Sequence, residues 1–235
     1  MNNEFITKLK NSSFLPYLGD DNEVIMIYLG GSRCFNMSDQ YSDYDIVVVT
    51  KNQSVRQEGK FGLKYQGKSV HWYYRTMLEL ILPVTENWEL LDSIAAVNLY
   101  ALEDNIIYIN NKYLKEAEFI LQHKKDLATN GAWNYALYND IYHKVKNTKE
   151  ITPEDCSKLM YHLCNCHSII FNKELNTSLC IRLKRLRRRN FKEENKEDLE
   201  KVRTMILEMD EYYKIHEQEI KNQRTNLINK LKEVL

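Results

Sequence analysis

Two aspartates separated by one residue, Asp43 and Asp45, form the pattern in this sequence with the clearest chemical meaning. They lead into the apolar, β-branched run DIVVVT at residues 45–50, which predicts a buried strand. Residues i and i+2 of a strand share a face, so we expect the two carboxylates to project together. Adjacent carboxylates repel each other unless a cation lies between them. Mg²⁺, which prefers oxygen ligands, is the cofactor we expect, with Mn²⁺ as the alternative ion.

A glycine-serine turn precedes these aspartates. The run VIMIYL at residues 24–29 predicts another buried strand, and Gly30-Gly31-Ser32 follows it directly. Glycines allow a sharp turn and a close approach of the backbone to a ligand. Ser32 stands where a helix would begin, and its hydroxyl with the backbone N–H groups there would suit a phosphate. Together with the aspartates, this turn predicts a metal–triphosphate site, although a polar turn between two strands is the alternative.

Composition narrows the class of protein. The chain has 235 residues, no formal net charge, 43% hydrophobic and 28% charged residues, so its overall charge gives no argument for nucleic acid or membrane binding. No apolar run reaches the length of a membrane span, and the N-terminus lacks the apolar core of a signal peptide. The five cysteines are an odd number, which favours reduced thiols over a disulfide scaffold. We therefore expect a cytoplasmic protein with no membrane partner.

The predicted fold class is α+β. A small mixed sheet with flanking helices would occupy residues 1–108, and a helical domain would occupy 109–235, with the boundary between Asn105 and Asn111. Apart from the two strands above, residues 61–65 and 69–75 predict a hairpin around Gln66-Gly67. Apolar periodicity predicts short helices at 3–9, 77–82 and 88–95, and longer ones at 112–125, 133–145, 153–171 and 178–189.

The last segment carries apolar residues at alternating steps of three and four, from Leu199 to Leu227. This heptad-like stripe predicts one long helix. It would either pack on its own domain or form a coiled coil, so a homodimer through the C-terminal helix is one of two alternatives.

Six cations stand close together in the second half: Arg182, Lys184, Arg185, Arg187, Arg188 and Arg189. They are either a solvated surface balanced by the acids of 193–200, or an anion site for a triphosphate or a nucleic acid backbone. On the helix predicted before them, Lys158, Tyr161 and His162 share one face. Lys158 could reach the phosphates of a nucleotide from there, or lie on the surface as an ordinary lysine.

The stretch GGSRCFNMSDQYSDYDIVVV resembles the nucleotidyltransferase signature of the DNA polymerase beta-like superfamily. Within that superfamily it is most similar to predicted bacterial and phage nucleotidyltransferases, which typically read Gly-Ser-Arg-x-x-Gly and then Ser-Asp-x-Asp. The resemblance implies transfer of a nucleoside monophosphate from an NTP, with ATP as the expected donor, to a hydroxyl acceptor. That acceptor could be a protein side chain, an RNA end or a small molecule such as an aminoglycoside.

The resemblance also implies roles for individual residues. Gly31 and Ser32 would seat the triphosphate, Asp43 and Asp45 would hold the metal ions, and Arg33 would bind phosphate or support the loop. The chain departs from the pattern in two places. Phe35-Asn36 stands where the second glycine is usual, and the strand SVHWYYR at residues 69–75 lacks the usual third carboxylate.

His71 is the residue of that strand whose side chain can act as a base near neutral pH. Either His71 substitutes for the carboxylate as a catalytic residue, or it is a sheet residue and the acid comes from elsewhere, with Glu79 the nearest acid downstream. The absence of the acid also leaves open a catalytically degenerate protein that binds a nucleotide or RNA without turnover.

Overall fold

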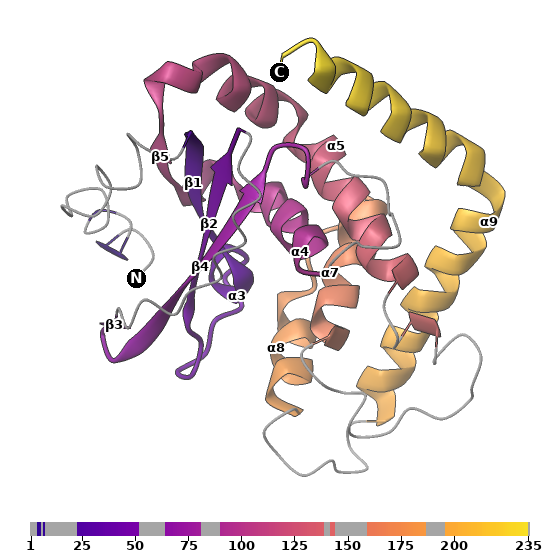
Figure 1. The fold of residues 1–235 in the computed structure, drawn as a ribbon. Coiled ribbons are helices and arrows are strands. Elements are labelled where there is room, and N and C mark those ends of the chain that lie inside the picture. The colour runs from indigo at the N-terminus through magenta and orange to yellow at the C-terminus, as the bar shows by residue number, and fades with distance from the viewer. Residues whose placement is uncertain are drawn as a thin grey trace.

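The computed structural model of the chain describes residues 4, 5, 7, 23–51, 64–80, 90–138, 142–143, 159–186 and 196–234, excepting the side chains at 90–92, 159–160 and 185–186. The fold is α+β, as predicted: a five-stranded sheet lies beside a group of packed helices (Figure 1). The strands are β1 (Val24–Gly30), β2 (Tyr44–Thr50), β3 (Lys64–Tyr65), β4 (Lys68–Thr76) and β5 (Ile106–Ile109).

The sheet has the order β3-β4-β2-β1-β5 and is mixed. β2 runs antiparallel to β1 and parallel to β4, while β3 and β5 form the antiparallel edges. In this register Gly30, Asp45 and His71 lie side by side on three adjacent strands. These three strands therefore bring the glycine turn, one aspartate and the histidine into a single row.

The central strands confirm the predicted burial on both faces. Val47 and Val49 join Tyr28 in an apolar cluster that continues into the helices, and Ile46 and Val48 belong to a second cluster on the opposite face. Because Asp45 alternates in step with Val47, its side chain lies on the face that the helices cover. A chemically active residue is thus placed at the border between the sheet and the helices.

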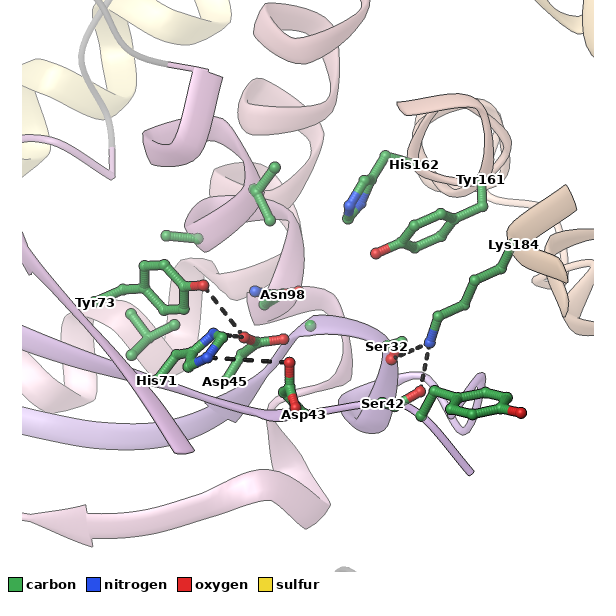
Figure 2. Close-up of a pocket in the computed structure, with 15 residues that line it drawn as sticks. Ser32, Ser42, Asp43, Asp45, His71, Tyr73, Asn98, Tyr161, His162 and Lys184 are labelled. Carbon is green, nitrogen blue, oxygen red and sulfur yellow. Dashed lines mark hydrogen bonds and ion pairs between the residues drawn. The ribbon is translucent and has the colours of Figure 1, made fainter. Parts of the chain in front are cut away.

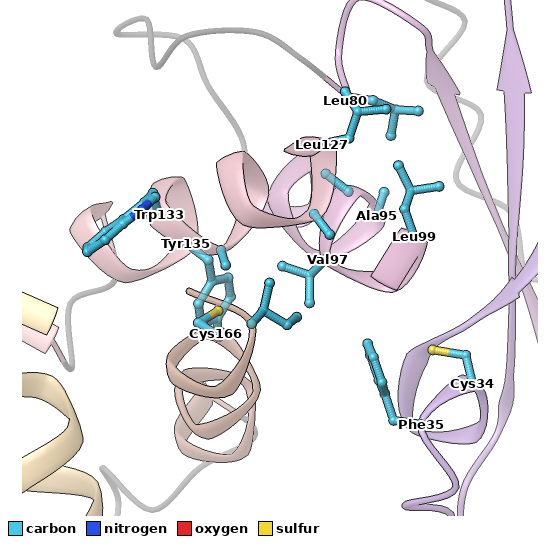
Figure 3. Close-up of a cluster of buried hydrophobic side chains, with 14 of the residues drawn as sticks. Cys34, Phe35, Leu80, Ala95, Val97, Leu99, Leu127, Trp133, Tyr135 and Cys166 are labelled. Carbon is cyan, nitrogen blue, oxygen red and sulfur yellow. The ribbon is translucent and has the colours of Figure 1, made fainter. Parts of the chain in front are cut away.

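The described helices are α3 (Gly31–Cys34), α4 (Leu90–Asn98), α5 (Leu114–Tyr138), α7 (Leu159–Ile170), α8 (Thr177–Leu186) and α9 (Lys196–Lys232). Short 3₁₀ turns at Leu99–Ala101, Glu103–Asn105 and Asn111–Tyr113 connect α4, β5 and α5. The apolar cluster on the helix side joins α4 and α5 to the sheet and continues into α7 (Figure 3). Residues of α9 belong to the same cluster. No helix in the described part of the chain is long and apolar enough to cross a membrane.

Two of the predicted helices at 112–125 and 133–145 are one helix, α5, as far as Tyr138. The error lies around Gly131, which does not interrupt the helix. A Cβ atom at Gly131 would lie 2.6 Å from the Cβ of Ala96, so the glycine allows α4 and α5 to pack closely. The predicted helix at 77–82 is also wrong in its described part, because residues 77–80 form a turn in which the Glu79 side chain accepts from the backbone N–H of Thr76.

The strand β5 was not predicted, and it completes the sheet by pairing with β1. The expected boundary at 108/109 falls inside this strand, and the division into two domains stays a prediction. The stripe of α9 is buried in the chain's own core at Leu199, Val202, Ile206, Met209, Ile220 and Leu227. A homodimer through this helix would therefore need another of its faces, and it too stays a prediction.

Candidate functional site

A cavity of about 440 Å³ lies where the sheet meets α4, α7 and α8 (Figure 2). Its size falls in the usual range of small-molecule sites. Most of the lining residues carry polar or charged groups, and a few are apolar: Gly31, Ser32, Tyr41, Ser42, Asp43, Asp45, Val47, His71, Tyr73, Ile94, Ala95, Asn98, Tyr161, His162 and Lys184. Two stretches that are more than a hundred residues apart in the sequence thus face each other across one space.

Asp43 and Asp45 project into this cavity together, as their spacing predicts. Asp45 lies on β2 and Asp43 on the loop just before it, and the Asp43 side chain is the more exposed of the two. The hydroxyl of Tyr73, on the neighbouring strand β4, donates to Oδ1 of Asp45 at 3.2 Å. This contact orients one carboxylate and leaves oxygens of both facing the cavity.

Two features of the backbone at position 31 require a glycine there. Its φ of +65° lies in the left-handed region that side chains disfavour. A Cβ atom there would lie only 2.0 Å from Oδ2 of Asp45. The carboxylate therefore rests directly against the backbone of the turn, so Gly31 permits the position of Asp45 itself.

His71 points at both aspartates from β4. Its Nδ1 lies 3.7 Å from Oδ1 of Asp45, and its Nε2 lies 4.0 Å from Oδ2 of Asp43. Both distances exceed a hydrogen bond. The position expected to carry the third acid is thus next to the pair, with an imidazole in that place.

Lys184 enters the cavity from α8 on the other side. Its ammonium group donates to the hydroxyls of Ser32, at 2.8 Å, and Ser42, at 2.6 Å. The sequence placed Lys184 in the basic run but did not separate it from Arg182, which forms a bidentate ion pair with Asp198 at 2.7 and 2.9 Å. Residues two apart on a helix point to different sides, and this spacing is the signal that distinguishes the two cations.

The structure describes the side chains of two cations of the basic run, Arg182 and Lys184. Arg182 fits the interpretation of a cation balanced by the acids of 193–200, whereas Lys184 fits the anion-site interpretation. The side chain of Arg185 and residues 187–189 lie outside the described part. Binding of a nucleic acid backbone by the basic run therefore stays a prediction. Lys158 also lies outside it, and its proposed contact with phosphate stays a prediction.

Arg33 supports the loop. Its buried guanidinium donates to the carbonyl oxygens of Ser42, at 2.7 Å, and Asp43, at 3.0 Å. It also lies over the ring of Tyr44, 3.8 Å from the centroid. Of the two roles expected for Arg33, these contacts favour support of the loop, because they hold the backbone that presents Asp43.

Asn36 stands where the second glycine of the signature is usual. It has a φ of +58°, a conformation that asparagine tolerates better than most residues.

Tyr161 and His162, on α7, lie opposite the aspartates (Figure 2). Their rings are 3.9 Å apart between centroids, and both side chains are largely buried. Cys34, the last residue of α3, is a poor nucleophile, because burial and the nearby charge of Asp45 raise the pKa of its thiol. Cys164 and Cys166 are buried in the core, and no metal-binding group of three His, Cys, Asp or Glu stands ready in the described ranges.

No protein-family model and no curated protein matches the sequence. Among solved structures, the chain is similar to a nucleotidyltransferase-like protein from Exiguobacterium sibiricum, with 12% sequence identity and a TM-score of 0.34. The alignment covers 95% of this chain and 79% of that one.

Proposed function

We propose that the protein is a metal-dependent nucleotidyltransferase that moves a nucleoside monophosphate from an NTP, expected to be ATP, to a hydroxyl acceptor. One observation carries the proposal: two carboxylates and a lysine-bound pair of serine hydroxyls face each other across a cavity of ligand size. Carboxylates suit a divalent ion, and the ammonium and hydroxyl groups suit phosphate oxygens. A triphosphate with its metal ion requires both.

The donor set fits such an ion. Asp43 and Asp45 supply hard oxygen ligands on one side of the cavity, and Gly31 leaves room for the Asp45 carboxylate. When bound there, Mg²⁺ or Mn²⁺ would polarise the α-phosphate and offset the charge that develops on the leaving oxygens.

The chain's own residues would supply the positioning. Lys184 and Ser32 would hold the β- and γ-phosphates, Arg33 would fix the loop, and Tyr73 would orient Asp45. The oxygen of the acceptor hydroxyl would form a bond to the α-phosphorus and release its proton to water, while the bond to the bridging oxygen breaks and pyrophosphate leaves. Positioning and electrostatic stabilisation supply most of the rate in such reactions.

The direct test uses the full chain with each NTP labelled at the α-phosphate, Mg²⁺ or Mn²⁺, and three acceptor classes: an RNA end, an aminoglycoside and added protein. We expect transfer of label and release of pyrophosphate by the natural protein and their loss in Asp43→Asn/Asp45→Asn. Asp104→Asn, which removes an exposed carboxylate outside the cavity, is the matched control. Equal transfer by the double variant would contradict the assignment of the aspartates.

A second candidate function is nucleotide binding without turnover. The observation that favours it is the imidazole of His71 in place of an acid on β4, next to the aspartates. Metal-dependent NTP binding with no pyrophosphate release in any acceptor class would support this alternative.

A further inference from the structure

The environment of His71 differs from that of an ordinary sheet histidine. Its partner across the parallel pair β2–β4 is Asp45, so the two side chains leave the sheet on the same face. Its Nε2 atom is buried and, among the described residues, has no hydrogen-bond partner. Most buried polar nitrogens in proteins have a hydrogen-bond partner, so this atom calls for a ligand that the described residues do not supply.

The surrounding groups indicate what that ligand is. Nε2 faces Oδ2 of Asp43 at 4.0 Å, and Nδ1 faces Oδ1 of Asp45 at 3.7 Å (Figure 2). An imidazole ring that lies between two carboxylates and has one nitrogen without a hydrogen-bond partner matches the mixed donor set of a divalent metal site.

We propose that Nε2 of His71 is a third protein ligand of the divalent ion held by Asp43 and Asp45, and that the site therefore prefers Mn²⁺ to Mg²⁺. The inference rests on the metal site of the proposed function and adds the identity of its ion. Mg²⁺ prefers an all-oxygen shell, whereas first-row transition ions accept imidazole readily. A neutral nitrogen also contributes one negative charge fewer than a carboxylate would. This loss of charge weakens the binding of a hard ion such as Mg²⁺ most.

The described separations are wider than those around a bound ion. Adjacent ligands of an octahedral ion with bonds near 2.1 Å lie about 3 Å apart. Nε2 of His71 and the carboxylate of Asp43 would have to approach by about 1 Å, a movement within the reach of side-chain rotation. This accounts for the absence of a preformed three-ligand group among the residues described.

The test uses the full chain and Mn²⁺ alone as the probe. Electron spin-echo spectroscopy of bound Mn²⁺ should show a nitrogen hyperfine coupling in the natural protein that is lost in His71→Gln. His162→Ala, which removes the other histidine of the cavity, should retain the coupling. Calorimetric titrations should show that His71→Asp lowers the ratio of Mn²⁺ to Mg²⁺ affinity by roughly tenfold or more. Thermal melting establishes that each variant is folded, and His71→Asn replaces a variant that is not.

The outcomes separate this inference from the proposed function. Mn²⁺ binding that requires Asp43 and Asp45 but shows no nitrogen coupling would overturn the role of His71 and leave the metal site in place. Mn²⁺ binding that survives Asp43→Asn/Asp45→Asn, or no binding at all, would overturn both. An unchanged Mn²⁺ to Mg²⁺ ratio in His71→Asp would overturn the predicted ion preference.

Discussion

Replacing Gly31 by alanine changes a single atom group, and the structure gives the size of the expected effect. The added Cβ would lie 2.0 Å from Oδ2 of Asp45, whereas ordinary contacts begin at 3.4 Å, so the oxygen would have to move by about 1.4 Å (3.4 − 2.0). The φ of +65° adds about 1–2 kcal/mol for any residue with a Cβ. Crowding in a packed site adds about 1–3 kcal/mol more.

Gly67→Ala is the matched control. Gly67 also has a positive φ, +75°, but nothing lies within 4 Å of its added Cβ. It should therefore lose only the conformational term of about 1–2 kcal/mol. The difference between the two variants isolates the contact with the Asp45 carboxylate.

The assays are denaturant unfolding, thermal melting and calorimetric titration with Mn²⁺. Gly31→Ala should lose about 2–5 kcal/mol of unfolding free energy, which for a chain of this length corresponds to roughly 4–20 °C in Tm. Its metal affinity should fall by about 100-fold, because a ligand displaced by more than 1 Å no longer meets the ion. If Gly31→Ala matched Gly67→Ala in stability and kept its Mn²⁺ affinity, the assigned position of Asp45 against the turn would be wrong.

Three further predictions concern the cations. Lys184→Met should weaken NTP binding by about 10–100-fold, the value of one charge-assisted contact, while the exposed-lysine control Lys201→Met leaves it unchanged; equal affinities in calorimetry would remove Lys184 from the phosphate site. Arg33→Lys cannot satisfy both carbonyls and should lose about 2–3 kcal/mol of stability in urea unfolding, and a stability equal to that of the natural protein would show that the clamp is dispensable. Arg182→Ala should cost less than about 1 kcal/mol, since its ion pair is partly exposed, and should not change NTP affinity. Because Arg182 lowers the pKa of Asp198, the ion pair stabilises the fold at pH values above the usual carboxylate pKa. The loss of unfolding free energy in Arg182→Ala should therefore vanish as the pH falls through that lowered pKa. A loss that does not depend on pH would contradict the pairing.

The parts of the site that the sequence could predict are those with short, regular spacing. The i, i+2 relation of Asp43 and Asp45 followed from strand alternation, and the burial of β1 and β2 followed from their continuous apolar runs. The glycine turn lies directly after β1, where it was predicted. The role of Gly31 in admitting a triphosphate stays a prediction, and the structure adds that a Cβ atom there would meet the Asp45 carboxylate.

The parts that the sequence could not predict depend on contacts between distant segments. Lys184 reaches Ser32 across 152 residues, and no local pattern encodes which cation of a basic run meets which serine. β5 has only four residues, too few for a periodicity to emerge, and its pairing with β1 makes it a strand. Gly131 lies in the gap between the helices predicted at 112–125 and 133–145, and only its contact with Ala96 shows that α5 needs a small residue there.

The central claim is that one cavity binds a metal ion on Asp43 and Asp45 and a triphosphate on Ser32 and Lys184. A crystal structure of the full chain with Mn²⁺ and a non-hydrolysable NTP analogue, with anomalous scattering recorded for manganese, tests it most directly. We predict an anomalous peak bound by both carboxylates, with the triphosphate extending from it to Ser32 and Lys184. A nucleotide bound elsewhere, or a triphosphate in this cavity without manganese at the aspartates, would contradict the account.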